Sequence, residues 1–194
     1  MLIRSLALTT ALVSAPLAAQ ADWTLDPSHT SIMFSVNHLG FSDTIGFFES
    51  FDGDVTFDAN NIPATEVSFT IDAASINTLW EARDAHIRNA DFLDVENHPA
   101  ITFVSTSVEQ TSDTTAIITG DMTLRGVTQE VTFDASLNQL APNPFNPTQG
   151  VAGFTITGEV DRTAFGIDFG APVIGAIIPV TINTELNAPA ALIN

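Results

Sequence analysis

The stretch SIMFSVNH, residues 31–38, places Ile32, Phe34 and Val36 on one side of an extended chain. Because successive side chains of a strand point to opposite faces, this pattern predicts a β-strand with one apolar face. The same alternation returns in residues 67–71, where apolar residues again occupy every second position. The unit of this fold is therefore a half-buried strand.

Similar short segments recur along most of the chain. We expect strands over residues 23–25, 31–38, 55–57, 67–71, 101–103, 114–123, 127–136, 151–161 and 180–185. Turn-prone sequences separate several of them, and many short strands at even spacing are typical of an antiparallel sandwich or barrel. The sequence therefore predicts an all-β fold. A barrel of about eight strands would leave room inside for side chains or for one slender ligand.

Two segments interrupt this alternation. Residues 76–92 carry Leu79, Trp80, Arg83 and Ile87 near helical spacing, which predicts a short helical excursion over one end of the barrel. Residues 137–150, LNQLAPNPFNPTQG, contain three prolines and are expected to form a loop.

The first 21 residues have the features of a secretory signal peptide. Arg4 precedes an apolar run over residues 5–18, and Ala19-Gln20-Ala21 matches a small-residue cleavage site. We expect cleavage between Ala21 and Asp22, a single domain over residues 22–194, and a periplasmic or secreted protein. No other segment approaches about 18 uninterrupted apolar residues, so stable membrane insertion is not expected.

Composition narrows the function further. The net charge is −18, and all five basic residues are arginines. Nucleic acid is an improbable partner, since phosphate binding needs a basic face. There is no cysteine, so neither thiol chemistry nor a disulfide is available. Fourteen phenylalanines and no tyrosine indicate an apolar interior, which either fills itself or holds an apolar guest.

One dense polar cluster, RDAHIRNADFLDVENHP at residues 83–99, needs separate treatment. Its two histidines, His86 and His98, with nearby carboxylates could bind zinc or serve a small-molecule hydrolase. Their spacing matches no tight ligand motif, and the chain has no G-x-S-x-G or H-E-x-x-H. We therefore predict no catalytic residue and no metal site. The favoured interpretation is that the cluster fastens an irregular segment to a barrel rim that also serves as a doorway.

Four segments, in order, resemble one known family. They are WTLDPSHTSIMFSVNHLGFSDTIGFFESFDGDVTFD (23–58), SINTLWEARDAHIRNADFLDVENHPAITFVS (75–105), GDMTLRGVTQEVTF (120–133) and DRTAFGI (161–167). The chain is similar to the YceI-like proteins, also called polyisoprenoid-binding or lipid-binding YceI-like domains. Residues that stand where the family pattern stands are Asp26, His29, His38, Arg83, His86, Asp91, Phe92, Pro99, Gly126, Arg162 and Gly166.

The resemblance implies an extended, lipocalin-like antiparallel β-barrel of eight strands with a short helical excursion. It implies a periplasmic binding or carrier protein, not an enzyme, that holds a long isoprenoid or another lipid. No cofactor is expected beyond such a guest, for example a polyprenyl compound or a quinone. The resemblance also implies frequent homodimers and, more loosely, a membrane cytochrome or quinone-linked partner. The alternatives are the hydrolase on the His86 and His98 region and a stress-response module that contacts other proteins.

The predicted site follows from this interpretation. The apolar tunnel is expected to be lined by Phe34, Val36, Phe69, Ile71, Leu79, Ile87, Phe92, Phe103, Phe133, Phe154, Phe165 and Ile167. The mouth, where a head group would lie, is expected to contain His38, Arg83, His86 and Arg162. The negative charge disfavours a diphosphate head unless arginines converge there. We therefore expect a neutral or weakly polar head, such as that of a quinone or a prenol.

Overall fold

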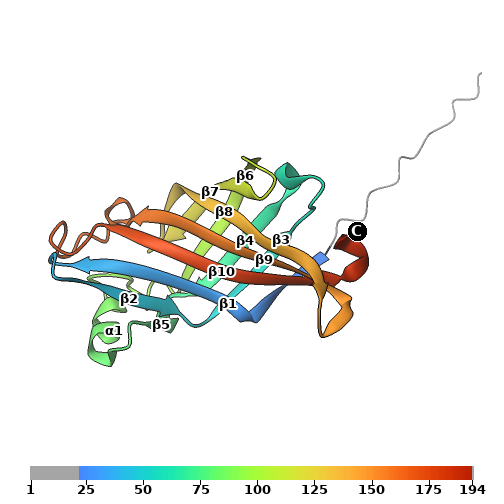
Figure 1. Ribbon diagram of the computed structural model, residues 1–194. Helices are drawn as coiled ribbons and strands as arrows, with labels where there is room; N and C mark the ends of the chain where they lie inside the picture. Colours follow the sequence, from blue (N-terminus) through green and yellow to red (C-terminus); the bar gives the residue numbers. More distant parts are fainter. Residues whose placement is uncertain (1–21, 194) are drawn as a thin grey trace, which may run out of the picture.

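One antiparallel sheet closes on itself to form a barrel in the computed structural model, which describes residues 22–193 (Figure 1). The signal peptide expected at residues 1–21 lies outside the described residues. The strands of the described part are β1 (Asp22–His38), β2 (Ser42–Phe48), β3 (Phe51–Thr56), β4 (Glu66–Asp72), β5 (Ile76–Asn77), β6 (Ala100–Gln110), β7 (Thr115–Leu124), β8 (Val127–Asn143), β9 (Asn146–Asp161) and β10 (Ile177–Pro189).

These strands make an eight-membered ring in residues 22–193. β2 and β3 both pair with β1 and form two halves of one bent strand, while β4 and β5 pair with β3 and β2 in the same manner. The remaining strands follow in chain order, and β10 returns to pair with β1. The predicted eight-stranded antiparallel barrel is therefore confirmed.

The helical excursion is confirmed but is shorter than the predicted segment. Residues 76–92 contain β5, turns and α1 (Glu81–Ile87), which is the one α-helix of residues 22–193. Short 3-10 turns lie at η1 (Ile62–Ala64), η2 (Ala73–Ser75), η3 (Arg162–Phe165) and η4 (Ala190–Ile193). No helix of the described chain has the length and apolarity needed to cross a membrane.

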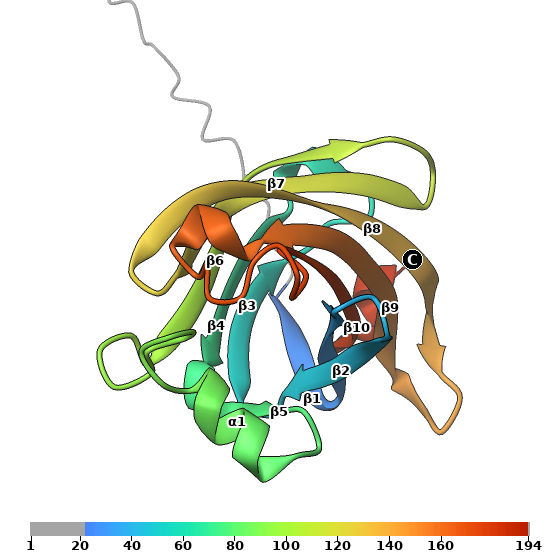
Figure 2. The ribbon, with the colours of Figure 1, turned by 90° about the vertical axis from the view of Figure 1, so that its left-hand side faces the viewer.

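The two longest irregular segments lie at one end of the barrel. The connections at this end are residues 39–41, 78–99, 125–126 and 162–176. Figure 2 looks at this end and shows α1 beside the opening, with the orange segment after β9 crossing in front of it. We call it the mouth end. β1 begins and β10 ends at the opposite end (Figure 1).

The loop predicted over residues 137–150 is wrong. β8 continues to Asn143 and β9 begins at Asn146, so the segment forms a hairpin. β7 pairs with β8 only as far as Ser136. Beyond that residue β8 pairs with β9 alone, so the other edge of β8 is free. Because proline is tolerated where a strand edge is free, Pro142 and Pro147 do not prevent strand formation here.

Phenylalanine rings lie against the inner wall of the barrel, over glycines of neighbouring strands. The pairs are Phe34 over Gly46, Phe69 over Gly53, Phe103 over Gly120 and Phe133 over Gly158. A Cβ atom on any of these glycines would lie within 2.9 Å of the facing ring. Three of the pairs are directly opposed in the strand register. The absence of a side chain on each glycine thus leaves the space that the facing ring occupies.

This arrangement predicts the effect of a single methyl group. A Cβ on Gly46 would lie 2.3 Å from Cζ of Phe34, so Gly46→Ala must push the ring toward the lumen. We expect a loss of about 1–3 kcal/mol in the free energy of unfolding, as for other overpacked interiors. Urea unfolding followed by the fluorescence of the buried Trp23 measures it.

Gly153→Ala on β9 is the matched control. No heavy atom lies within 4 Å of the position that its Cβ would occupy. We expect no destabilisation, and a gain of about 0.4–1 kcal/mol where the backbone permits alanine. Equal losses in the two variants would contradict the proposed role of the Phe–Gly pairs.

Candidate ligand cavity

The barrel encloses an apolar cavity of about 400 Å³ that opens toward the mouth end. Its walls are lined by side chains from β1, β2, β4, β5, β6, β7, β8, β9 and β10, and α1 and the segment after β9 contribute to its mouth. A second hollow of about 100 Å³ lies beyond it and shares Val67, Phe69, Ile118 and Ile156 with it. The inward residues therefore do not meet in the middle of the barrel.

Most of the predicted site residues surround this cavity. Of the predicted tunnel residues, the lining includes Phe34, Val36, Phe69, Ile71, Ile87, Phe92, Phe103, Phe133 and Ile167. All four predicted mouth residues also line it: His38, Arg83, His86 and Arg162. Their location agrees with the prediction, while their role in binding a ligand stays a prediction.

Three predicted tunnel residues lie elsewhere. Leu79 is 76% exposed, because α1 begins only at Glu81 and the residue precedes it in a turn with φ of 63°. Phe154 lines the smaller hollow, where its ring centroid lies 5.3 Å from that of Phe57. Phe165 is 1% exposed and packs into the main hydrophobic core from η3. The prediction that these three line the main cavity is therefore wrong.

Sequence reasoning also missed part of the lining. Ile178, Val180 and Ile182 follow the period of two on β10 and could have been found by extending that pattern. Phe169 and Ile174 come from the irregular segment after β9, where no periodicity marks them. Only the closure of the barrel brings these two residues to the mouth.

Three aromatic rings meet at the mouth. His86 of α1 lies edge-on to Phe92 and to Phe169, with ring centroids 5.0 Å and 5.3 Å away. Phe92 and Phe169 are themselves 5.2 Å apart. His86 Nε2 also lies 3.3 Å from a carboxylate oxygen of Asp91. The cluster joins the excursion before β6 to the segment after β9, so both segments border one opening.

Arg162 holds the second of these segments in place. Arg162 is 6% exposed. Its guanidinium group donates hydrogen bonds to the carbonyl oxygens of Gly175, Ile167 and Ile174, at 2.7–2.8 Å. Burial lowers the pKa of Arg162, while the nearby carboxylates of Asp161 and Asp168 oppose the shift. The side chain thus fixes the turn that carries Phe169 and Ile174.

The other three arginines of the described chain act in the same way. Arg83 donates to the carbonyl oxygen of Thr78, and Arg88 donates to the carbonyl oxygens of Ala74 in η2 and Ile76 in β5. Arg125 joins the carbonyl oxygens of Gly166 and Ala90, at 2.6 Å and 2.7 Å. All four arginines of residues 22–193 therefore donate to backbone carbonyl oxygens, and Arg83 and Arg88 do so from within the 83–99 cluster.

The two histidines of that cluster do not form one site. His86 pairs with Asp91, whereas His98 Nε2 lies 3.9 Å from Asp94. Within residues 22–193, the one group of three convergent potential metal ligands comprises Asp26, His29 and Glu185, which belong to β1 and β10. The geometry therefore gives no support to a shared centre at His86 and His98.

A closed antiparallel barrel around an apolar cavity places the chain in the lipocalin-like class of β-barrels. The family model described as the YceI-like domain matches residues 23–186. The chain belongs to the YceI-like family, which confirms the resemblance.

Relatives and solved structures agree with this family assignment. The chain is 41% identical over 165 residues to a UPF0312 protein of Pseudomonas putida, covering 84% of this chain and 85% of that protein. The structure resembles a YceI protein of Campylobacter jejuni with a TM-score of 0.71 at 25% identity, covering 78% of this chain and 88% of that one.

A more distant likeness supports the fold alone. A polyisoprenoid binding domain from Saccharophagus degradans gives a TM-score of 0.66 at 14% identity, covering 87% of this chain and 99% of that one.

The clamp of Arg162 predicts a local effect on amide exchange. In Arg162→Met, the amides of Ile174 and Gly175 should exchange about tenfold faster or more, because three charge-assisted hydrogen bonds to their segment are lost. Hydrogen exchange read by mass spectrometry or NMR measures this. In the matched control Arg88→Met, exchange in residues 166–175 should be unchanged. Unaltered exchange of these amides in Arg162→Met would show that the clamp is not needed.

Proposed function

We propose that this protein binds a long-chain isoprenoid or a similar lipid in the barrel interior and carries it through the periplasm. The observation that carries the proposal is the cavity of about 400 Å³, whose lining is almost entirely apolar. A volume of this size falls within the range of pockets that hold small ligands. The structural neighbour from Saccharophagus degradans is a polyisoprenoid binding domain, which is in accord with this class of ligand.

The energetics favour a hydrocarbon guest. Transfer of one CH₂ group from water into an apolar site is favourable by about 0.8 kcal/mol. A few isoprene units therefore supply enough gross binding energy to exceed the loss of translational and rotational freedom. Selection would then depend on the length and shape of the cavity more than on hydrogen bonds.

The mouth supports a neutral head group. The arginines of the described chain donate to backbone carbonyl oxygens, and three nitrogens of Arg162 are occupied in this way. The whole chain carries a net charge of −18, which opposes the approach of an anion. A prenol or a quinone head, placed near His38, Arg83 and His86, meets less opposition than a diphosphate does.

A cavity-filling variant tests the site of binding. Met122 lines the cavity, so Met122→Trp should lower the affinity for geranylgeraniol about tenfold or more by occupying the space of the chain. Val104→Trp is the control, since Val104 on β6 is 52% exposed. Isothermal titration or ligand fluorescence measures both. Equal affinities for the two variants would place the lipid outside the barrel.

The head-group preference has its own test. At low salt, geranylgeraniol should bind at least as tightly as geranylgeranyl diphosphate, because the arginines of the described chain are engaged by backbone and do not compensate the charge of the diphosphate. Markedly tighter binding of the diphosphate would overturn the neutral-head proposal and leave the apolar cavity as the binding site.

The periplasmic location is tested by processing. The polypeptide recovered from the periplasm should begin at Asp22, with the sequence Asp22-Trp23-Thr24, after removal of the predicted signal peptide. N-terminal sequencing or intact mass measures this. An unprocessed chain confined to the cytoplasm would contradict it. The homodimer and the cytochrome or quinone-linked partner stay predictions from the family resemblance.

A further inference from the structure

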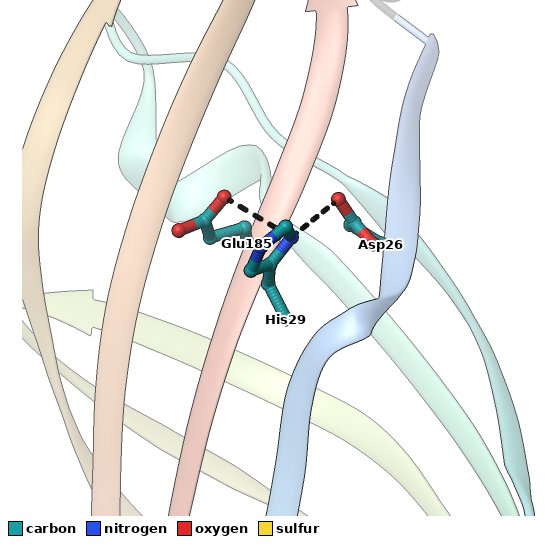
Figure 3. Close-up of side chains that lie close together, drawn as sticks. All are labelled: Asp26, His29 and Glu185. Carbon is teal, nitrogen blue, oxygen red and sulfur yellow. Dashed lines mark hydrogen bonds and ion pairs between the residues drawn. The ribbon is translucent and has the colours of Figure 1, made fainter.

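A cluster of metal-ligand side chains lies on the seam where the barrel closes, away from the cavity mouth. Asp26 on β1 stands opposite Glu185 on β10, and the pairing of these strands is interrupted between Asp26 and Ser31. His29 lies within this interruption. Figure 3 shows its imidazole between the two carboxylates, which come from neighbouring strands.

The donor atoms of the three residues converge. Nδ1 of His29 lies 3.0 Å from Oδ2 of Asp26 and 3.9 Å from Oε2 of Glu185. One ligand atom from each residue lies within 4.8 Å of the other two. An imidazole nitrogen with two carboxylate oxygens is a donor set that zinc accepts, and water can complete the coordination on the open side.

Neighbouring groups hold Asp26 in its orientation. Its Oδ1 accepts hydrogen bonds from the backbone N–H and the hydroxyl of Ser28, at 2.9 Å and 2.6 Å. The side-chain amide of Asn187 donates to Oδ2 at 3.3 Å. These donors, Ser28 first, keep the pKa of Asp26 well below its ordinary value, so the carboxylate is charged. Supporting hydrogen bonds of this kind raise the metal affinity of a ligand.

We propose that Asp26, His29 and Glu185 bind one divalent transition-metal ion, with zinc as the best match. The ion would bridge β1 and β10 at the point where the ladder between them is broken. The ion binds the lone pair of Nδ1 of His29, so a proton on that nitrogen passes to Nε2 or to solvent when the ion binds. The three side chains replace water molecules of the hydrated ion. Residues from two strands and a bulge would thus be joined across the closing seam.

Zinc titration of the metal-stripped protein tests the proposal. In buffer with physiological salt and excess Mg²⁺, the wild type should bind one zinc ion saturably. Glu185→Gln and His29→Gln should each weaken binding about tenfold or more, because each removes a direct ligand. Zinc should also raise the melting temperature of the wild type, since the site exists only in the folded chain, and this rise should be lost in both variants.

The chain offers a matched control. Asp91→Asn removes the carboxylate of the other short His–Asp pair, His86 with Asp91 at 3.3 Å, and should leave zinc binding unchanged. Circular dichroism should show the same β-sheet spectrum for all variants. Zinc binding that is unchanged in Glu185→Gln and His29→Gln would overturn the proposal. The absence of saturable zinc binding in the wild type would overturn it equally.

Discussion

The cavity depends on the contact between phenylalanine rings and cross-strand glycines. An eight-stranded barrel has an interior that ordinary side chains nearly fill. Here the rings of Phe34, Phe69, Phe103 and Phe133 occupy space next to the wall that a Cβ on the facing glycines would take. A composition rich in phenylalanine therefore supplies apolar surface without closing the lumen. Phenylalanine on one strand is paired with glycine on its neighbour, and the barrel interior retains a cavity of about 400 Å³.

Arginine side chains stabilise the backbone at the mouth end, although the chain has only five basic residues. Four arginines fasten the segment before β6, the turn after β7 and the segment after β9 by donating to carbonyl oxygens. These bonds position His86, Phe92 and Phe169 around the opening. The proposal of a hydrocarbon guest with little charge rests on these engaged arginines, on the net charge of −18 and on the apolar interior.

The sequence predicts the barrel well, because the alternation of apolar and polar residues indicates which face of each strand is buried. It predicts nine of the twelve tunnel residues for the same reason, since Phe34, Phe103 and Phe133 lie on clearly alternating strands.

The sequence-based prediction fails at Leu79, where helical spacing begins before the helix does, and at Phe165, which a 3-10 turn directs into the core. It also fails at residues 137–150, where prolines suggested a loop although the free edge of a hairpin accommodates them. Phe169 and Ile174 carry no local signal, because only the Arg162 clamp and barrel closure place them. The convergence of Asp26 and Glu185 likewise depends on strand register, which no local pattern reveals.

Native mass spectrometry of the protein purified from its own cells tests the central claim most directly. An apolar lumen in this YceI-like barrel predicts one tightly held apolar lipid per chain, released by organic solvent and identified in the extract. A homogeneous bare polypeptide mass, together with failure of the stripped protein to take up a prenol, would contradict the account of the interior as a hydrocarbon site.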